Sequence, residues 1–106
     1  MREIDQVSFA AAHAEGAAVV DVREPDEYLA GHVPGARPIP LGQLPEHLGD
    51  LPRDEPVYLI CASGNRSLAA AGLLARAGFD AVSVTGGTGA WQRAGRTVVR
   101  GAQPSV

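Results

Sequence analysis

The stretch VYLICASGNRSLAAAGLLARA, residues 57–77, decides the expected fold of this chain. Val57 to Cys61 is an apolar run rich in strand-forming residues, typical of a strand buried on both faces. Arg66 to Ala77 has a helical composition, and Gly78 follows it as a typical helix-ending residue. Only small or polar residues separate the two. The stretch therefore predicts the strand, loop and helix unit from which α/β domains are built.

The same alternation continues on both sides of this unit. Further strands are expected at Ala17–Val22, Ala81–Thr85 and Thr97–Arg100, with a marginal one at Pro38–Ile39; helices are expected at Ser8–Glu15, Pro25–Ala30, Leu44–Leu48 and Thr88–Ala94. We therefore expect an α/β fold of three layers, with a mostly parallel sheet of about five strands flanked by helices. The sequence predicts one domain over residues 1–106, with a core at about 3–100 and a frayed, flexible tail at 101–106.

The composition narrows the function. Nine basic residues, all arginine, against twelve acidic ones give a net charge of −3, which argues against a nucleic-acid or membrane-surface partner. No stretch approaches the roughly 18 apolar residues of a membrane span, and the start lacks the apolar segment of a signal peptide, so a cytoplasmic location is expected. The single cysteine excludes an internal disulfide, and the three histidines are scattered, so neither a metal nor a cofactor is expected.

The single cysteine, Cys61, falls at the carboxyl end of a strand, where α/β sheets form their ligand sites. Gly64 and Asn65 tolerate a tight curl that turns backbone N–H groups inward as an anion-binding nest. Arg66 opens the following helix and adds a permanent positive charge beside its positive end. Such surroundings lower the pKa of a thiol and favour the nucleophilic thiolate.

A simpler interpretation is that Cys61 is a small buried apolar residue, as free cysteines usually are. A purely structural cysteine has no need of a Gly-Asn turn and an arginine at a helix start directly after it. The neighbours therefore favour an active thiolate.

Four short stretches together resemble the rhodanese-like domains, the single-domain sulfurtransferases. They are Val20–Arg23 (VDVR), Gly31–Ala36 (GHVPGA), Cys61–Ser67 (CASGNRS), and Gly86–Gly87 followed by Ala90–Trp91. The resemblance covers about residues 19–96. It implies a small parallel sheet flanked by helices, in agreement with the pattern of strands and helices above.

The resemblance also implies a mechanism. Cys61 would take the outer sulfur of a donor, thiosulfate or a persulfide, and pass it from a Cys61 persulfide to an acceptor such as cyanide or a thiol, including a protein thiol. The substrate-binding residues implied are the loop residues Ala62, Ser63, Gly64, Asn65, Arg66 and Ser67. Asp21 and Arg23 are expected to brace this loop rather than to take part in the chemistry.

Two features of the sequence bear on the substrate. Four residues separate Cys61 from Arg66, whereas cysteine phosphatases of related fold have five, so a phosphatase or arsenate reductase is the weaker alternative. A non-catalytic sulfur-sensing or docking module is a second alternative, although such modules generally lack the cysteine. The acidic segment Glu24–Glu27 is expected to repel a dianionic donor such as thiosulfate.

Overall fold

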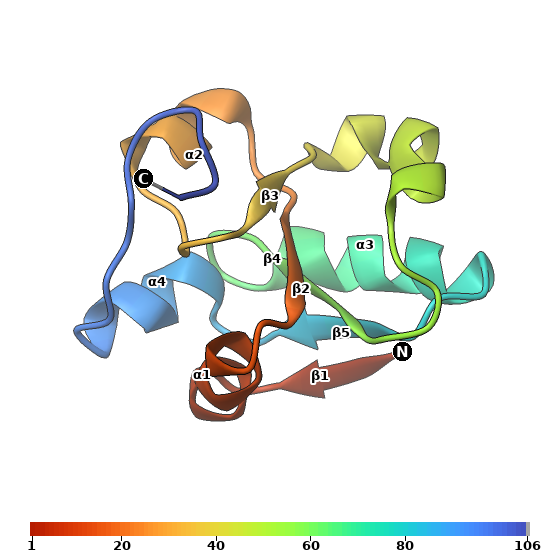
Figure 1. Cartoon of the computed structure of the whole chain (residues 1–106), viewed down its shortest axis with the longest axis horizontal. Helices are drawn as coiled ribbons and strands as arrows, with labels where there is room; N and C mark the ends of the chain where they lie inside the picture. The colour runs from red at the N-terminus through yellow and green to blue at the C-terminus, as the bar shows by residue number, and fades with distance from the viewer. Residues whose placement is uncertain (106) are drawn as a thin grey trace.

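The computed structural model describes residues 1–105 and contains a five-stranded sheet in which every neighbouring pair of strands is parallel. The elements in chain order are β1 (Arg2–Ile4), α1 (Gln6–Ala14), β2 (Ala18–Asp21), α2 (Pro25–Ala30), β3 (Arg37–Pro38), the 3₁₀ segment η1 (Leu41–Asp50), β4 (Val57–Ile60), α3 (Asn65–Arg76), β5 (Ala81–Val84) and α4 (Gly87–Arg93). The strand order across the sheet is β1-β5-β4-β2-β3, so β4 is central (Figure 1). The predicted three-layer α/β fold with a parallel sheet of five strands is confirmed.

Each face of the sheet carries its own apolar core, because neighbouring strand residues point in opposite directions. Val20 and Leu59, which pair across β2 and β4, lie on the face covered by α3 and η1 together with Leu44 and Leu74. On the other face, α1 and α4 pack against Val19, Ile60 and Val84 through Phe9 and Trp91. Figure 1 shows these two groups of helices on either side of the strands.

The structure differs from the expected strands at both edges. β1, which pairs with β5, has no apolar run and keeps only Ile4 partly buried, so its sequence carries no strand pattern. Residues 97–100 do not join the sheet. Within them, Val99 forms a single antiparallel bridge with His32. The sheet therefore has five strands as expected, but β1 takes the place of the strand expected at residues 97–100.

The segment 101–105 is tied to the domain, whereas the sequence predicts a frayed tail there; Val106 lies outside the described residues. His32 is fully buried, and its Nε2 lies 2.8 Å from the Gln103 carbonyl oxygen and 3.1 Å from that of Pro104. Its Nδ1 lies 2.9 Å from the Tyr28 carbonyl oxygen, and its ring stacks on that of Tyr28. Composition gives no sign of these contacts, because they depend on a histidine about seventy residues earlier.

Candidate active site

Cys61 lies directly after β4, at the carboxyl edge of the sheet between the ends of β5 and β2. Its residue is 1% exposed, and it contacts the apolar core on the α3 side. The loop of residues 61–64 then leads into α3. The central position of β4 holds the sulfur on a rigid base, because that strand is bonded on both sides.

The loop folds back so that its own backbone donates to the sulfur. The N–H of Gly64 donates to Cys61 Sγ at 3.0 Å, and the Ser67 hydroxyl oxygen lies 3.6 Å from the same atom. Gly64 has φ of +112°, in the left-handed region that favours glycine, and a Cβ there would lie 3.3 Å from the backbone nitrogen of Gly86. A glycine at position 64 is therefore what allows the curl expected from the sequence.

These donors act on the ionisation of the thiol. Burial acts to raise the pKa of Cys61, because it disfavours the charged thiolate. Hydrogen bonds from the Ser67 hydroxyl and from the backbone N–H groups of Ser67, Gly64 and Ser63 outweigh burial. The pKa of the thiol is therefore lowered below its ordinary value of 9.0. The site raises the fraction of thiolate through hydrogen bonds from neutral groups.

Ser67 has a second partner that the sequence did not single out. Its hydroxyl oxygen lies 3.1 Å from the Gly64 carbonyl oxygen and 2.9 Å from the hydroxyl oxygen of Ser83 on β5, so its single hydrogen can turn from that carbonyl to the sulfur when the thiol ionises. Both serines are buried. Ser83 lies within an apolar strand, and a buried hydroxyl there requires a hydrogen-bond partner. This need is the one sign of the contact that the sequence offers. The resemblance implies Ser67 only as one of the substrate-binding loop residues, without a contact to β5.

Replacing Ser67 by alanine is expected to raise the thiol pKa, because a hydrogen bond that favours the thiolate is lost. The rate of Cys61 alkylation by iodoacetamide, followed against pH, measures this directly, since the chain has one cysteine. The rate rises as the thiolate forms, so its inflection should move to higher pH. Ser63→Ala is the matched control, because Ser63 is exposed and its backbone N–H is kept. A Ser67→Ala profile that overlies the wild-type profile would contradict the assignment.

Arg66, expected to bind the donor, is already paired with an acidic side chain of α2. Its Nη1 and Nη2 donate to the two carboxylate oxygens of Glu27 at 2.6 Å and 2.8 Å. These bonds from Arg66 lower the pKa of Glu27 to about 2. The bonds to Glu27 also raise the pKa of Arg66, and the charge of Cys61 adds a smaller contribution. The acidic segment Glu24–Glu27 therefore contacts Arg66 directly, through the carboxylate of Glu27.

The first turn of α4 supports the loop from behind. The N–H of Thr88 donates to the Cys61 carbonyl at 2.8 Å, and the N–H of Gly89 donates to the Ala62 carbonyl at 3.0 Å. Gly87 has φ of +56°, and a Cβ there would lie 2.2 Å from the Cys61 carbonyl oxygen. The Gly-rich stretch before Trp91 is thus a turn into a helix, as the sequence predicts, and it also fixes the backbone of the nucleophile.

Asp21 and Arg23 form a buried ion pair where β2 ends, one strand away from Cys61. Arg23 Nη2 lies 2.8 Å from Asp21 Oδ2, and the two side chains are 7% and 0% exposed. The same Nη2 donates to the Gly31 carbonyl at 2.8 Å. Asp21 is paired with Ile60 in the sheet register, so the pair lies beside the strand that carries Cys61. Both charges have all their contacts within the protein, which suits a bracing role.

The predicted site residues fall into three groups. Cys61, Gly64, Arg66 and Ser67 carry side-chain or backbone contacts at the sulfur or at Glu27. Ser63 and Asn65 have exposed side chains, and the Ala62 carbonyl is bound by α4. Asp21 and Arg23 lie one strand away and do not contact the sulfur through any bond the structure records.

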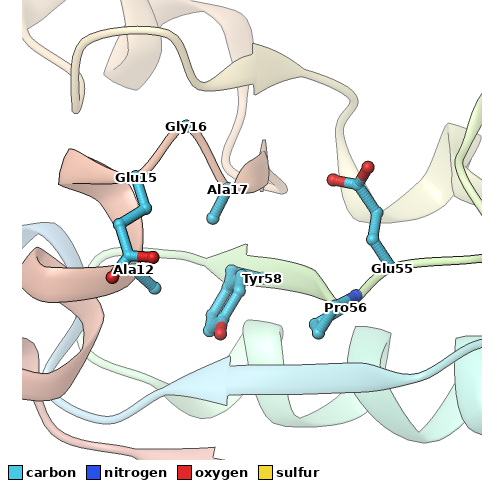
Figure 2. A pocket seen from close by; sticks show the side chains of 7 residues that line it. All are labelled: Ala12, Glu15, Gly16, Ala17, Glu55, Pro56 and Tyr58. Carbon is cyan, nitrogen blue, oxygen red and sulfur yellow. The ribbon is translucent and has the colours of Figure 1, made fainter.

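A surface cavity lies away from Cys61, at the opposite edge of the sheet. It has a volume of about 550 Å³ and is lined by Ala12, Glu15, Gly16, Ala17, Glu55, Pro56 and Tyr58. Figure 2 shows Glu15 and Glu55 on either side of Tyr58. Ala17 and Pro56 directly precede β2 and β4, so this cavity marks the amino ends of the strands, whereas Cys61 follows a carboxyl end. This cavity therefore does not contain Cys61 or any other residue of the 61–67 loop.

Residues 1–105 contain neither a metal-binding cluster nor a membrane-spanning helix. Among them, no three His, Cys, Asp or Glu side chains gather in an arrangement that could hold a metal ion. In the same residues, every helix falls short of the length and apolar character needed to cross a membrane.

Comparison with known proteins agrees with the fold. The family model of the rhodanese-like domain matches residues 6–94. Thiosulfate sulfurtransferase GlpE of Pseudomonas putida is 39% identical over 79 residues, which cover 74% of this chain and 72% of that protein. Uncharacterized protein YqhL of Bacillus subtilis is 38% identical over 92 residues, covering 86% of this chain and 72% of YqhL. The crystal structure of a rhodanese-related protein from Thermoplasma volcanium superposes with a TM-score of 0.87 at 36% identity, covering 93% of this chain and 98% of the other.

Proposed function

Because the chain belongs to the rhodanese-like domain family, we propose that it is a sulfurtransferase that carries sulfane sulfur as a persulfide on Cys61. The donor would be thiosulfate or a persulfide, and the acceptor cyanide or a thiol, including a protein thiol. Support comes from a relative named as a thiosulfate sulfurtransferase, at 39% identity, and from the surroundings of the sulfur.

The first half-reaction moves one sulfur atom onto the protein. The Cys61 thiolate attacks the outer sulfur of the donor, and the donor's S–S bond breaks. Sulfite leaves with the bonding electron pair when the donor is thiosulfate, and a thiolate leaves when the donor is a persulfide. The charge is conserved, because the negative charge of Cys61 passes to the terminal sulfur of its persulfide.

The second half-reaction returns the protein to its starting state. Cyanide or a thiolate attacks the terminal sulfur, the S–S bond on Cys61 breaks, and Cys61 leaves as a thiolate. Cyanide thereby becomes thiocyanate. Since the donor product leaves before the acceptor reacts, ping-pong kinetics are expected. A lowered thiol pKa serves both halves, because Cys61 is the nucleophile in one and the leaving group in the other.

The observation that carries the proposal is the hydrogen bond of 3.0 Å from the Gly64 N–H to Cys61 Sγ. A donor fixed in this way stabilises negative charge on sulfur before any substrate arrives, as an oxyanion hole does for oxygen. The loop glycine that provides it has the left-handed backbone and the close contact with Gly86 described above. The persulfide would extend from this same sulfur into the ring of loop amides.

The proposal is tested by the mass of the intact protein after treatment with a sulfur donor. Thiosulfate or glutathione persulfide is added, excess donor is removed, and the protein is expected to gain the mass of one sulfur atom. Cyanide should then release that sulfur as thiocyanate and restore the original mass. Protein alkylated at Cys61 beforehand is the control. No gain of mass with either donor would overturn the proposal.

A phosphatase is the weaker second candidate for two physical reasons. The loop from Cys61 to Arg66 has four intervening residues, so its ring of amides is smaller than the one that surrounds a phosphate in cysteine phosphatases. Arg66, the residue expected to bind the phosphate oxygens, is engaged by the Glu27 carboxylate. A phosphate dianion would have to displace this carboxylate or share its donors.

A further inference from the structure

The ion pair between Glu27 and Arg66 joins two helices at the mouth of the loop. Glu27 comes from α2 and Arg66 from the first turn of α3, next to the residues that surround Cys61. The contact is bidentate, with Nη1 to Oε1 at 2.6 Å and Nη2 to Oε2 at 2.8 Å. The two terminal nitrogens of the guanidinium are the atoms that would hold the oxygens of a sulfonate or sulfite group. A carboxylate of this chain already holds them.

Glu27 is fixed in this position by a further contact. Its Oε1 also accepts the backbone N–H of Glu24 at 3.0 Å, so the carboxylate is held at the start of α2. The side chains of Arg66 and Glu27 are 36% and 31% exposed, so the pair faces solvent and an incoming molecule can reach it. Since the bonds from Arg66 lower the pKa of Glu27 to about 2, the carboxylate stays charged throughout the neutral range.

The charge beside the sulfur is therefore balanced. Arg66 alone would attract an oxyanion, but Glu27 cancels its charge at close range. Arg23, at the end of the Val20–Arg23 stretch, does not supply the missing charge, because its side chain is 7% exposed and is bound to Asp21 and the Gly31 carbonyl. A dianionic donor then meets the negative thiolate with a neutral pair at the rim, whereas a persulfide has no sulfonate oxygens beside its reacting sulfur atoms.

We propose that Glu27 is a specificity-determining residue that occupies the anion-binding face of Arg66 and so directs the site toward persulfide donors and away from thiosulfate. The proposal rests on the sulfurtransferase function proposed above and identifies the class of donor. The effect is assigned to the direct contact between Glu27 and Arg66, whereas the sequence alone indicates only repulsion by the whole acidic segment Glu24–Glu27. The leaving group in the preferred reaction is a thiolate, and the sulfur transferred is the outer atom of the donor's persulfide.

Glu27→Gln is the test variant, because glutamine has the same shape and its amide oxygen can still accept the Glu24 N–H. The measured quantity is the ratio of kcat/KM for thiosulfate to kcat/KM for glutathione persulfide. We expect this ratio to rise about fivefold, since Arg66 regains a net positive charge toward the sulfonate oxygens. Benzenethiosulfonate, a monoanion that keeps sulfonyl oxygens, should show an intermediate increase.

Asp26→Asn is the matched control. Asp26 is exposed on the same turn of α2, and its side chain makes no hydrogen bond or ion pair in the described residues 1–105. The variant removes the same charge without touching Arg66, so its donor ratio should stay within about twofold of the wild-type ratio. An equal rise in both variants would assign the effect to overall charge and overturn the proposal. An unchanged ratio in Glu27→Gln would also overturn it.

A second measurement needs no sulfur transfer. Sulfate that binds at Arg66 should protect Cys61 from iodoacetamide, and the sulfate concentration that gives half-protection should fall about fivefold in Glu27→Gln. Equal sulfate protection in Glu27→Gln and the wild type would overturn the role of Glu27 by itself. Failure of the wild-type protein to form a persulfide with any donor would instead overturn the sulfurtransferase function, so the two failures are distinguishable.

Discussion

Replacement of Cys61 by alanine is expected to abolish sulfur transfer, with a loss of about 10⁴-fold or more that reaches the uncatalysed background. The chain has no other cysteine, so no second thiol can carry the sulfur. Thiocyanate formation from thiosulfate and cyanide, and from glutathione persulfide and cyanide, measures the loss. The mass gain of one sulfur atom should disappear in the same variant.

Cys61→Ser separates the chemistry from the fold. A serine hydroxyl can still accept the Gly64 N–H and contact Ser67, so the loop should keep its conformation. Its pKa is far above that of a thiol, and oxygen does not form a persulfide, so this variant should be equally inactive. Comparable unfolding midpoints for wild type and Cys61→Ser would show that the loss is chemical. Residual turnover in either variant above background would contradict the role of Cys61.

Gly87→Ala is expected to lower the free energy of unfolding by about 3 kcal/mol and to reduce sulfur transfer by about 100-fold or more. The new Cβ would lie 2.2 Å from the Cys61 carbonyl oxygen and 2.8 Å from that of Ala62. Backbone atoms cannot rotate away as a side-chain tip can. The loop that holds the sulfur must therefore move, and the Thr88 and Gly89 N–H groups lose their alignment with it.

Gly95→Ala is the matched control for this effect. Gly95 has φ of +77°, which is also left-handed, but a Cβ there would have no atom within 4 Å. The backbone penalty alone is about 1 kcal/mol, and activity should be kept. Urea unfolding and thiocyanate formation measure both variants. A Gly87→Ala protein as stable and active as Gly95→Ala would contradict the close approach of α4 to the loop.

The interior of the sheet could be predicted because its residues carry the pattern themselves. β2, β4 and β5 are valine-rich or apolar runs buried on both faces, and each lies within the range expected from the sequence. β1 could not be predicted in this way, since an edge strand with two exposed side chains has no such run. Edges and tails depend on partners elsewhere in the chain, as the contacts of His32 with residues 103–104 illustrate.

In α3, the sequence pattern predicts the helix but not which of its residues are buried. The helical spacing of Leu68, Ala71, Gly72 and Ala75 predicts that these residues pack on the sheet, but Leu68 is 37% exposed. The buried face is Ser67, Ala70, Ala71 and Leu74. The shift by one residue arises because Ser67 turns inward to reach Ser83 and Cys61. A pattern of apolar residues cannot identify a polar residue that is buried because of its hydrogen bonds.

In the candidate site, contacts within the loop could be predicted from the sequence, and contacts between separate elements could not. The loop, its glycine and its arginine are contiguous in sequence, so their proximity to Cys61 follows from local geometry. The contacts of Glu27 with Arg66, and of Ser83 with Ser67, cross from one element to another. Their pairing depends on how α2, α3 and β5 are placed around β4, which no local pattern specifies.

The support of the loop by α4 has a consequence for the order of folding. Thr88 and Gly89 hold the carbonyls of Cys61 and Ala62, and β1 pairs with β5. A nascent chain that has emerged only as far as Ala77 already contains the thiol and the arginine but lacks these clamps. Such long-range contacts form late, because their loop-closure entropy is paid before they stabilise anything. The loop around the sulfur is therefore completed only after α4 has been synthesised, because the hydrogen bonds from Thr88 and Gly89 are absent before then.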